Sequence, residues 1–227
     1  MAYTLLQLRT LARQRADMEN SQLVLDPELT NYVNDSYAEL YDLLVTQFED
    51  YYLAAPQTFT IASGSNTQAL PATFYKLRAI DLQNGSDWLT VRQFNFAERN
   101  HRATSISRIG YAAKNVSYRV MGQNIYFEPE LDAAGTYRLW FIPRYTPLVA
   151  DGDTMGDVLD FGEYVIIDAA IKMLIKEESD IGALMAQKQA MTERVMTMAK
   201  DRTVDQPERI ADVSMDAYSF EGLFRRN

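Results

Sequence analysis

The sequence predicts an α+β protein: a four-helix bundle with an inserted antiparallel β domain and an extended C-terminal tail. Two segments with helical periodicity precede a central block, and two more follow it. Within the block, short runs of alternating apolar and polar residues are separated by turn residues, which is typical of strands. We expect residues 1–55 and 157–202 to form the two halves of one bundle, residues 56–156 the β domain, and residues 203–227 a docking tail.

The first two helices are expected at residues 4–18 and from about residue 26 to residue 52. In the first, apolar residues recur at helical spacing, at Leu5, Leu8 and Ala12. The second opens with Asp26-Pro27-Glu28, which we interpret as an N-cap, a proline at the first helical position and an acid in the first turn. A broad apolar stripe follows, which predicts one buried face.

The central block is expected to form strands joined by tight turns. The expected strands are residues 57–62, 74–82, 88–91, 118–121, 125–127 and 136–144. Asn84-Gly85 and Gly122 tolerate the positive φ that two-residue hairpin turns require. The last strand is apolar on both faces, which predicts a central position or contact with a second layer. Residues 94–100 are expected to form a short helix, and residues 104–110 a loop.

Two helices are expected after the block, at residues 160–178 and about 181–201. Asp160 and Glu163 fit a capping box at the start of the first one. Few of its faces are polar, so we expect a buried central helix. It carries Asp168, a buried acid that must find a partner. An arginine of the first helix is one candidate, and a neighbouring subunit or water is the other. In the last helix one side is shared by Leu184, Lys188, Met191, Val195 and Met198.

Composition excludes several classes of chemistry. The 227 residues include no cysteine and a single histidine, His101. Disulfide scaffolds, iron–sulfur centres, thiolate zinc sites and cysteine nucleophiles are therefore excluded, as is a histidine-rich metal site. No phosphate loop, dinucleotide-binding motif or nucleophile elbow is present. We therefore expect no enzyme, no catalytic or metal-ligating residue and no cofactor. No apolar stretch is long enough to span a membrane, and no signal peptide is recognised.

Charge is distributed unevenly along the chain. The formal net charge is −9, from 22 basic and 31 acidic residues, whereas residues 92–119 carry six basic residues against one acidic residue, or +5. This asymmetry favours docking between unlike surfaces, such as contacts between subunits, and the candidate docking residues are Arg99, Arg102 and Arg108. Nucleic-acid contact and an ordinary exposed loop are the alternatives.

The tail is unusually rich in aromatic residues for an extended segment. Disordered tails are usually poor in aromatics, whereas aromatic and arginine side chains dominate interface hot spots. We therefore interpret the end of the chain as a docking peptide that orders on a partner, with a frayed terminus as the alternative. The proposed docking residues are Tyr218, Phe220, Leu223, Phe224, Arg225 and Arg226.

Several segments resemble the head–tail adaptor (connector) proteins of tailed bacteriophages, in the longer form that carries an inserted β domain. Residues 8–17 read LRTLARQRAD, residues 29–44 read LTNYVNDSYAELYDLL, and residues 163–172 read EYVIIDAAIK. Residues 74–77, 94–100, 118–120 with 125–127, and 139–143 are similar to the β portion of these longer members. The resemblance covers most of the chain and weakens after about residue 213.

The resemblance implies a structural virion protein in the neck or collar, made in the host cytoplasm. Related adaptors form a ring of about twelve subunits below the portal, extend the DNA channel and provide the attachment surface for tail or nozzle proteins. Genomic DNA would pass through the lumen without specific binding, and no membrane is involved. The helices would build the ring wall, and residues 203–227 would reach toward the portal.

Three alternatives remain open at this point. The nearest is a tail-tube or nozzle component of the same particle. A DNA-packaging accessory protein that binds nucleic acid would show strongly salt-sensitive DNA binding. A hydrolase carried on a tail would need a pair of acids that spacing alone does not identify.

Overall fold

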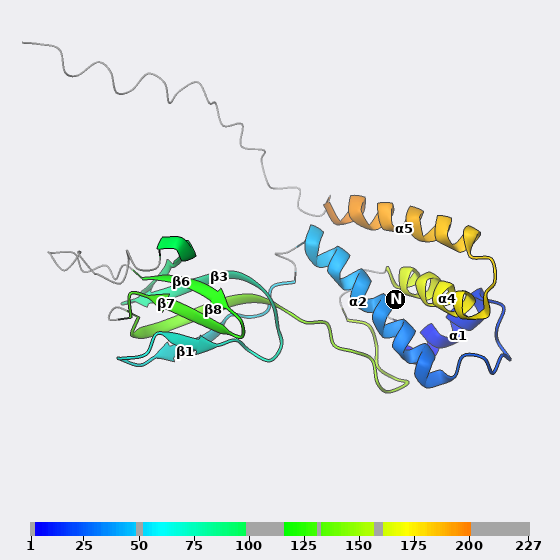
Figure 1. Cartoon of the computed structure of the whole chain (residues 1–227), viewed down its shortest axis with the longest axis horizontal. Helices are drawn as coiled ribbons and strands as arrows, with labels where there is room; N and C mark the ends of the chain where they lie inside the picture. Colours follow the sequence, from blue (N-terminus) through cyan, green and yellow to red (C-terminus); the bar gives the residue numbers. More distant parts are fainter. Residues whose placement is uncertain (1–2, 49–51, 99–115, 131–132, 157–160, 201–227) are drawn as a thin grey trace, which may run out of the picture.

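The structure is a computed structural model that describes residues 3–48, 52–98, 116–130, 133–156 and 161–200. The order of elements confirms the α+β class: α1 (Leu5–Arg15) and α2 (Asp26–Gln47) precede eight strands, and α4 (Gly162–Glu177) and α5 (Gly182–Lys200) follow them. Figure 1 shows the helices gathered at one end of the molecule and the strands at the other.

The helix boundaries follow from local capping, and two expected caps are wrong. α1 begins after Thr4, whose hydroxyl accepts from the Gln7 backbone N–H while the Gln7 side chain accepts from the Thr4 N–H. The N-cap of α2 is Leu25 rather than Asp26, so the acid lies inside the first turn, and the helix ends at Gln47 rather than near residue 52. The N-cap of α4 is Phe161, without a side-chain hydrogen bond, and not the expected Asp160, which lies outside the described residues.

α4 is the central helix of this part, as expected. It packs against α1, α2 and α5. Four of its residues are fully shielded from solvent, namely Val165, Ala169, Ala170 and Met173. α5 packs through Val195 and, in part, through Leu184 and Met191. Met198, expected on the same side, is 46% exposed, because it lies near the end of the helix, beyond Val195, the last core residue of α5.

The strands form two four-stranded sheets that enclose a second apolar core. The first sheet has the order β1-β8-β3-β4, with β1 at Gln57–Ile61, β3 at Phe74–Asn84, β4 at Asp87–Thr90 and β8 at Gly135–Pro143. The second has the order β2-β7-β6-β5, with β2 at Thr67–Ala69, β5 at Arg92–Gln93, β6 at Ser117–Met121 and β7 at Asn124–Glu128.

Three features of the β part differ from expectation. β5 pairs with β6 in parallel, so the strands are not all antiparallel. β2 is too short, at three residues, to give a readable alternation in the sequence. Within the described residues of the 94–100 stretch, the helix is reduced to one 3-10 turn at Phe96–Glu98.

β8 holds a central position in its sheet, as its apolar character predicted, and it also connects the two cores. It lies between β1 and β3, and its inward residues Tyr137, Leu139 and Phe141 belong to the core between the sheets. Ile142, one residue further, is fully buried in the core of the helices. Turn glycines with positive φ, Gly85 at 66° and Gly122 at 61°, close the two expected hairpins.

A close contact at the start of α4 gives the first prediction. A Cβ atom at Gly162 would lie 2.4 Å from Cδ2 of Tyr3. We expect Gly162→Ala to lower the free energy of unfolding by about 1–3 kcal/mol, because overpacking outweighs the gain in helix propensity. Urea denaturation followed by circular dichroism measures the change.

Gly152→Ala is the matched control, because a Cβ atom there meets nothing within 4 Å. In a Tyr3→Ala background, Gly162→Ala should have little effect, since the conflicting ring is gone. Wild-type stability of the single Gly162→Ala variant would contradict this packing.

Candidate functional site

The segment that follows β8, residues 144–156, forms hydrogen bonds with α1 and α2. The Asn34 side chain of α2 donates to the Leu148 carbonyl at 2.9 Å and accepts from the Leu148 N–H at 2.8 Å. The first two backbone N–H groups of α1 donate to the carbonyls of Asp153 and Asp151, at 2.9 and 3.2 Å. The segment therefore satisfies donors at a helix N-terminus that would otherwise lack partners.

The side chain of Asp153 stabilises a turn within this segment. The carboxylate accepts from the backbone N–H groups of Val149 and Ala150, both at 2.8 Å. These hydrogen bonds lower the pKa of Asp153 below its usual value. The turn that presents Val149 is therefore stabilised by the Asp153 side chain.

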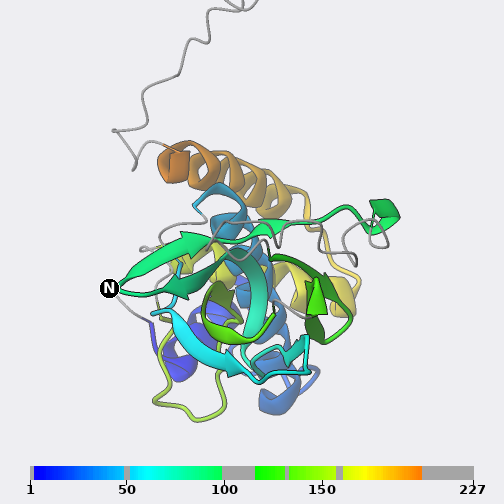
Figure 2. The ribbon, with the colours of Figure 1, turned by 90° about the vertical axis from the view of Figure 1, so that its left-hand side faces the viewer.

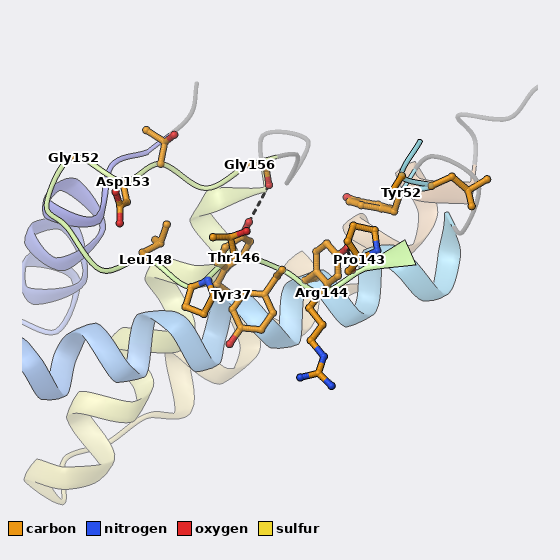
Figure 3. A pocket seen from close by; sticks show the side chains of 15 residues that line it. Tyr37, Tyr52, Pro143, Arg144, Thr146, Leu148, Gly152, Asp153 and Gly156 are labelled. Carbon is orange, nitrogen blue, oxygen red and sulfur yellow. Dashed lines mark hydrogen bonds between the residues drawn. The ribbon is translucent and has the colours of Figure 1, made fainter. Parts of the chain in front are cut away.

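A tyrosine-lined cleft of about 720 Å³ lies where this segment crosses α2 (Figure 3). The Tyr37 hydroxyl donates to the Gly156 carbonyl at 3.1 Å, and the Tyr41 hydroxyl donates to the Pro143 carbonyl at 2.7 Å. Ring centroids are 5.2 Å apart for Tyr37 and Tyr145 and 5.3 Å apart for Tyr41 and Tyr52, both in edge-to-face arrangements. These phenols hold the β part on α2.

Tyr75 of β3 makes a further contact between the β part and α2. Its hydroxyl donates to the Asp42 carboxylate of α2, and its ring is 6.1 Å from that of Tyr41. The hydrogen bond to Asp42, with burial second, raises the pKa of Tyr75 to about 12. The phenol therefore remains protonated, and able to donate, throughout the physiological range.

A buried charge network joins α2, α4 and α5 around Asp168, whose exposed fraction is 2%. Lys188 of α5 donates to its Oδ1 at 2.6 Å, and Lys172 lies 2.7 Å from its Oδ2. The Ser36 hydroxyl of α2 lies 2.7 Å from the same Oδ2. Both lysines also contact Glu39 of α2, at 3.0 and 3.2 Å. Each of the three helices contributes a charged or polar partner, so the network fixes their relative positions.

The pKa directions agree with this geometry. Burial alone would raise the pKa of Asp168, but the hydrogen bonds from Lys172, Lys188 and Ser36 outweigh it and lower the pKa. Burial opposes the charged form of Lys188, yet hydrogen bonds to Asp168 and Glu39 prevail and raise its pKa. The shifts therefore favour the ionised forms of Asp168 and Lys188 at neutral pH.

The need of Asp168 for a partner was predicted correctly, but the expected arginine of the first helix is wrong. The arginines of α1 bind other acids: Arg9 pairs with Asp151, Arg13 with Asp26 and Arg15 with Glu163. α5 lies beside the Asp168 position of α4 and brings Lys188 there instead. Lys172 is four residues after Asp168, a spacing that the sequence offered as a signal.

A second buried carboxylate, Asp81 of β3, organises the first sheet. It accepts from Arg138 Nη2 at 2.8 Å and from Trp140 Nε1 at 2.7 Å, both from β8. The Arg138 guanidinium lies 4.4 Å from the ring centroid of Trp88 and 5.0 Å from that of Trp140. Burial would raise the pKa of Asp81, but hydrogen bonds from Trp140, Arg138 and Thr90 lower it.

These two networks are suited to holding elements together. A general acid or base needs a lone pair or proton available to a substrate, with a pKa near the working pH. Here both carboxylates are saturated with donors, and the pKa of each is lowered. Among the described residues, no three histidine, cysteine, aspartate or glutamate side chains are arranged to hold a metal ion. No helix in that same part of the chain is long and apolar enough to cross a membrane.

The predicted docking residues lie in segments that the structure does not describe. This applies to Arg99, Arg102 and Arg108, and also to His101. It applies equally to the tail residues Tyr218, Phe220, Leu223, Phe224, Arg225 and Arg226. Their docking role therefore remains a prediction. The tyrosine cleft and the 144–156 segment were not predicted as a site, because their residues come together only in the fold.

Comparison with known families identifies the chain. The family model described as SU10 adaptor protein matches residues 3–211. The chain belongs to the SU10 adaptor protein family. A search of the curated proteins finds no match.

Membership of the SU10 adaptor family confirms the coarser part of the resemblance drawn from the sequence. It makes the chain a structural adaptor protein of a bacteriophage, and hence a component of the virion. The family is not known as a family of enzymes. The match includes both the helices and the β part, and it ends at residue 211, before the aromatic end of the tail.

The Asp168 network gives the second prediction. We expect Asp168→Asn to lower the free energy of unfolding by about 3–5 kcal/mol, because two lysines lose their buried counter-charge. The folded-state pKa of Asp168 is lowered, so its contribution is present above the unfolded-state pKa of about 3.9 and is lost as the pH falls through the folded-state value. Urea denaturation of both proteins between pH 7 and acid pH, at intervals of about one unit, measures this.

Glu28→Gln is the control, because Glu28 pairs with Lys176 between the same helices at the surface. It should have a much smaller effect at pH 7. In Asp168→Asn the acid-induced loss of stability should be shallower than in the wild type. Equal stability of Asp168→Asn and Glu28→Gln would show that the buried network does not hold the helices.

Proposed function

We propose that the protein is a head–tail adaptor that forms a ring below the portal, extends the DNA channel and provides the attachment surface for tail or nozzle proteins. The observation that carries the proposal is the match of the SU10 adaptor family to residues 3–211. The rigid joints around Asp168 and the tyrosine cleft support it, since a conduit must keep its shape while binding partners at two ends.

In this proposal the helices form a four-helix bundle that builds the ring wall, from residues 1–55 and 157–202. Residues 56–156 form the inserted β domain, which faces outward or toward the tail. Contacts of α4 with the other three helices support a common helical core, and the separate core between the sheets supports a distinct β unit. Residues 203–227 reach toward the portal.

The charge of the chain suits a conduit for DNA. With −9 per subunit, a ring of about twelve would carry on the order of −100 charges before counterions. Such a field repels phosphate, so genomic DNA passes without specific binding. Arg99, Arg102 and Arg108 then serve as contacts to acidic surfaces of the portal or a neighbouring subunit.

Electron microscopy of the protein mixed with the portal protein of its particle tests the proposal. Rings seated on the narrow end of the portal are the expected result. Labelling of the tail tube or nozzle in intact virions would favour the tail-component alternative. Strong, salt-sensitive binding to DNA would favour a packaging accessory instead.

The charged contacts give the third prediction. Replacing Arg99, Arg102 and Arg108 together with glutamate should leave a folded chain that no longer assembles onto the portal, since charge reversal sets like charges against each other. We expect at least tenfold weaker binding to the portal, which corresponds to about 1.4 kcal/mol, together with a loss of infectious particles. Plaque assays and sedimentation with the portal measure the two effects.

The matched control replaces the same three arginines with lysine, which keeps the charge and changes the geometry. This control should retain most of the assembly. Normal infectivity of the triple glutamate variant would refute the assignment of these residues.

The tail gives the fourth prediction. Deletion of residues 215–227 should abolish docking on the portal, because it removes all six proposed anchor residues, including four with large apolar side chains. Co-sedimentation with the portal measures the loss. The control replaces only Arg225 and Arg226 with alanine, which separates the charged from the aromatic contribution. Unchanged docking of the truncated chain would defeat the proposed role of the tail.

A further inference from the structure

The first sheet has two edge strands that match each other. In the part of the chain that the structure describes, β1 and β4 each pair on one side only, with β8 and β3. Each strand of this sheet runs antiparallel to the next, so β1 and β4 run in opposite directions. They are similar in length, with five residues in β1 and four in β4. Figures 1 and 2 show β1 at the lower margin of the strands. An unpaired strand edge can pair with a strand of another chain.

The unpaired backbone groups of β4 belong to Trp88 and Thr90. The Val91 N–H donates to the Ile80 carbonyl of β3 at 2.8 Å. In an antiparallel pair, residues that bond to the neighbouring strand alternate with residues whose N–H and C=O groups point to the other side. The backbones of Leu89 and Val91 therefore face β3, and those of Trp88 and Thr90 point to the free edge.

The unpaired backbone groups of β1 belong to Thr58 and Thr60. When the same alternation is followed across β3, the backbone of Arg138 in β8 faces β3 and that of Tyr137 faces β1. Tyr137 lies opposite Phe59, so the backbone of Phe59 faces β8. The N–H and C=O groups of Thr58 and Thr60 therefore point to the free edge, and both threonines are exposed.

The β1 edge lacks the charges that normally protect an exposed strand. Charged residues make up 23% of the chain, yet none occurs from Tyr51 to Tyr75, a run that contains all of β1 and β2. Edge strands that stay unpaired usually carry a lysine or another charge, a proline or a bulge. Pro56 lies before β1, and β1 pairs with β8 in regular register along its whole length. The edge is therefore open to a further strand.

β4 leaves an apolar side chain uncovered at its edge. Leu89 is 43% exposed, although it lies opposite Leu82, which is 4% exposed and belongs to the core between the sheets. Side chains of directly opposed residues share one face of a sheet. Leu89 therefore lies on the core side of β4, where the core does not extend far enough to cover it. A strand added beside β4 would cover this side chain.

We propose that β4 of one subunit pairs with β1 of the next copy of this chain, so that the first sheets join edge to edge. A small rotation between copies preserves the strand directions, so this pairing is antiparallel. In the centred register Thr90 lies opposite Thr58, and the free donors and acceptors of the two strands meet. Leu89 then lies opposite Phe59 of the neighbour, which forms an apolar cross-strand pair on the core side.

The choice of a second copy rests on the proposed function, which requires a contact that repeats around a ring. Head-to-tail contacts close into a ring and leave no free edge in the first sheet, whereas two-fold pairing of β1 with β1 leaves both β4 edges open. The second sheet does not offer the same match. Its edge strands β2 and β5 have three and two residues, and β5 pairs in parallel with β6. The junction is therefore confined to the first sheet.

Cysteine cross-linking tests the junction, because the chain has no cysteine of its own. The full-length double variant Thr58→Cys, Thr90→Cys, oxidised or treated with a short bismaleimide, should give a ladder of dimers, trimers and higher species on a denaturing gel. A mixture of the two single variants should stop at the dimer. Each single variant alone should stay monomeric, since like positions do not meet in a head-to-tail contact.

The matched control is the double variant Thr58→Cys, Ala186→Cys, because Ala186 is exposed on α5, among the helices. It should give no ladder. Dimers from Thr58→Cys alone would overturn the head-to-tail junction in favour of two-fold pairing of β1. The absence of cross-links in the Thr58 and Thr90 double variant, both in solution and on portal-bound protein, would overturn strand pairing between copies.

A proline at the β1 edge gives a second test that leaves β4 unchanged. Thr58→Pro should leave the chain folded, because the N–H group that proline lacks points to the free edge. It should abolish ring formation, whereas Thr58→Ala, which keeps this N–H group, should form rings. Urea denaturation and electron microscopy of portal-bound protein measure the two effects. Rings of Thr58→Pro, or an unfolded Thr58→Pro chain, would contradict the proposed geometry of the edge.

The same samples separate this inference from the proposed function. A ladder from protein that never binds the portal would refute the head–tail role and retain the contact between copies. Protein seated on the portal as a ring without any cross-link between positions 58 and 90 would retain the adaptor role and refute the strand junction.

Discussion

The arrangement of the helices depends on the buried carboxylate of Asp168. Its two oxygens receive an ammonium group from α4, an ammonium group from α5 and a hydroxyl from α2. A buried charge without such partners would cost several kilocalories per mole, so the helices are restricted to positions that keep every partner in reach. Apolar contacts allow small sliding movements, whereas this set of directed contacts fixes register, which is the property that a subunit of a larger assembly requires.

The helices and the sheets are held together by a different kind of contact, namely hydrogen bonds from tyrosine and asparagine side chains. Three tyrosine hydroxyls donate hydrogen bonds across the boundary: those of Tyr37 and Tyr41 to carbonyls, and that of Tyr75 to a carboxylate. Asn34 binds both polar groups of the Leu148 backbone. The rings fill space while their hydroxyls satisfy polar groups that the crossing chain brings with it. The boundary is therefore polar and specific, and it orients the β part relative to α2 without a large apolar contact.

An adaptor protein acts through surfaces, and the structure distributes its chemistry accordingly. Among the charged side chains of the described residues, Asp168 and Asp81 are buried, and both carboxylates are saturated with donors from neighbouring elements. They therefore hold elements of the fold together and are not presented to a partner.

Local periodicity in the sequence was sufficient to predict the α+β class, the four helices, the hairpins at Gly85 and Gly122, and the buried position of β8, because each depends on neighbours within a few residues. The sequence also revealed that Asp168 needs a partner. Only the tertiary structure decided that Lys172 and Lys188 form ion pairs with Asp168, since the arginines of α1 carry the same charge. The tyrosine cleft and the parallel pairing of β5 with β6 were likewise decided by packing, because each joins segments that no local pattern relates.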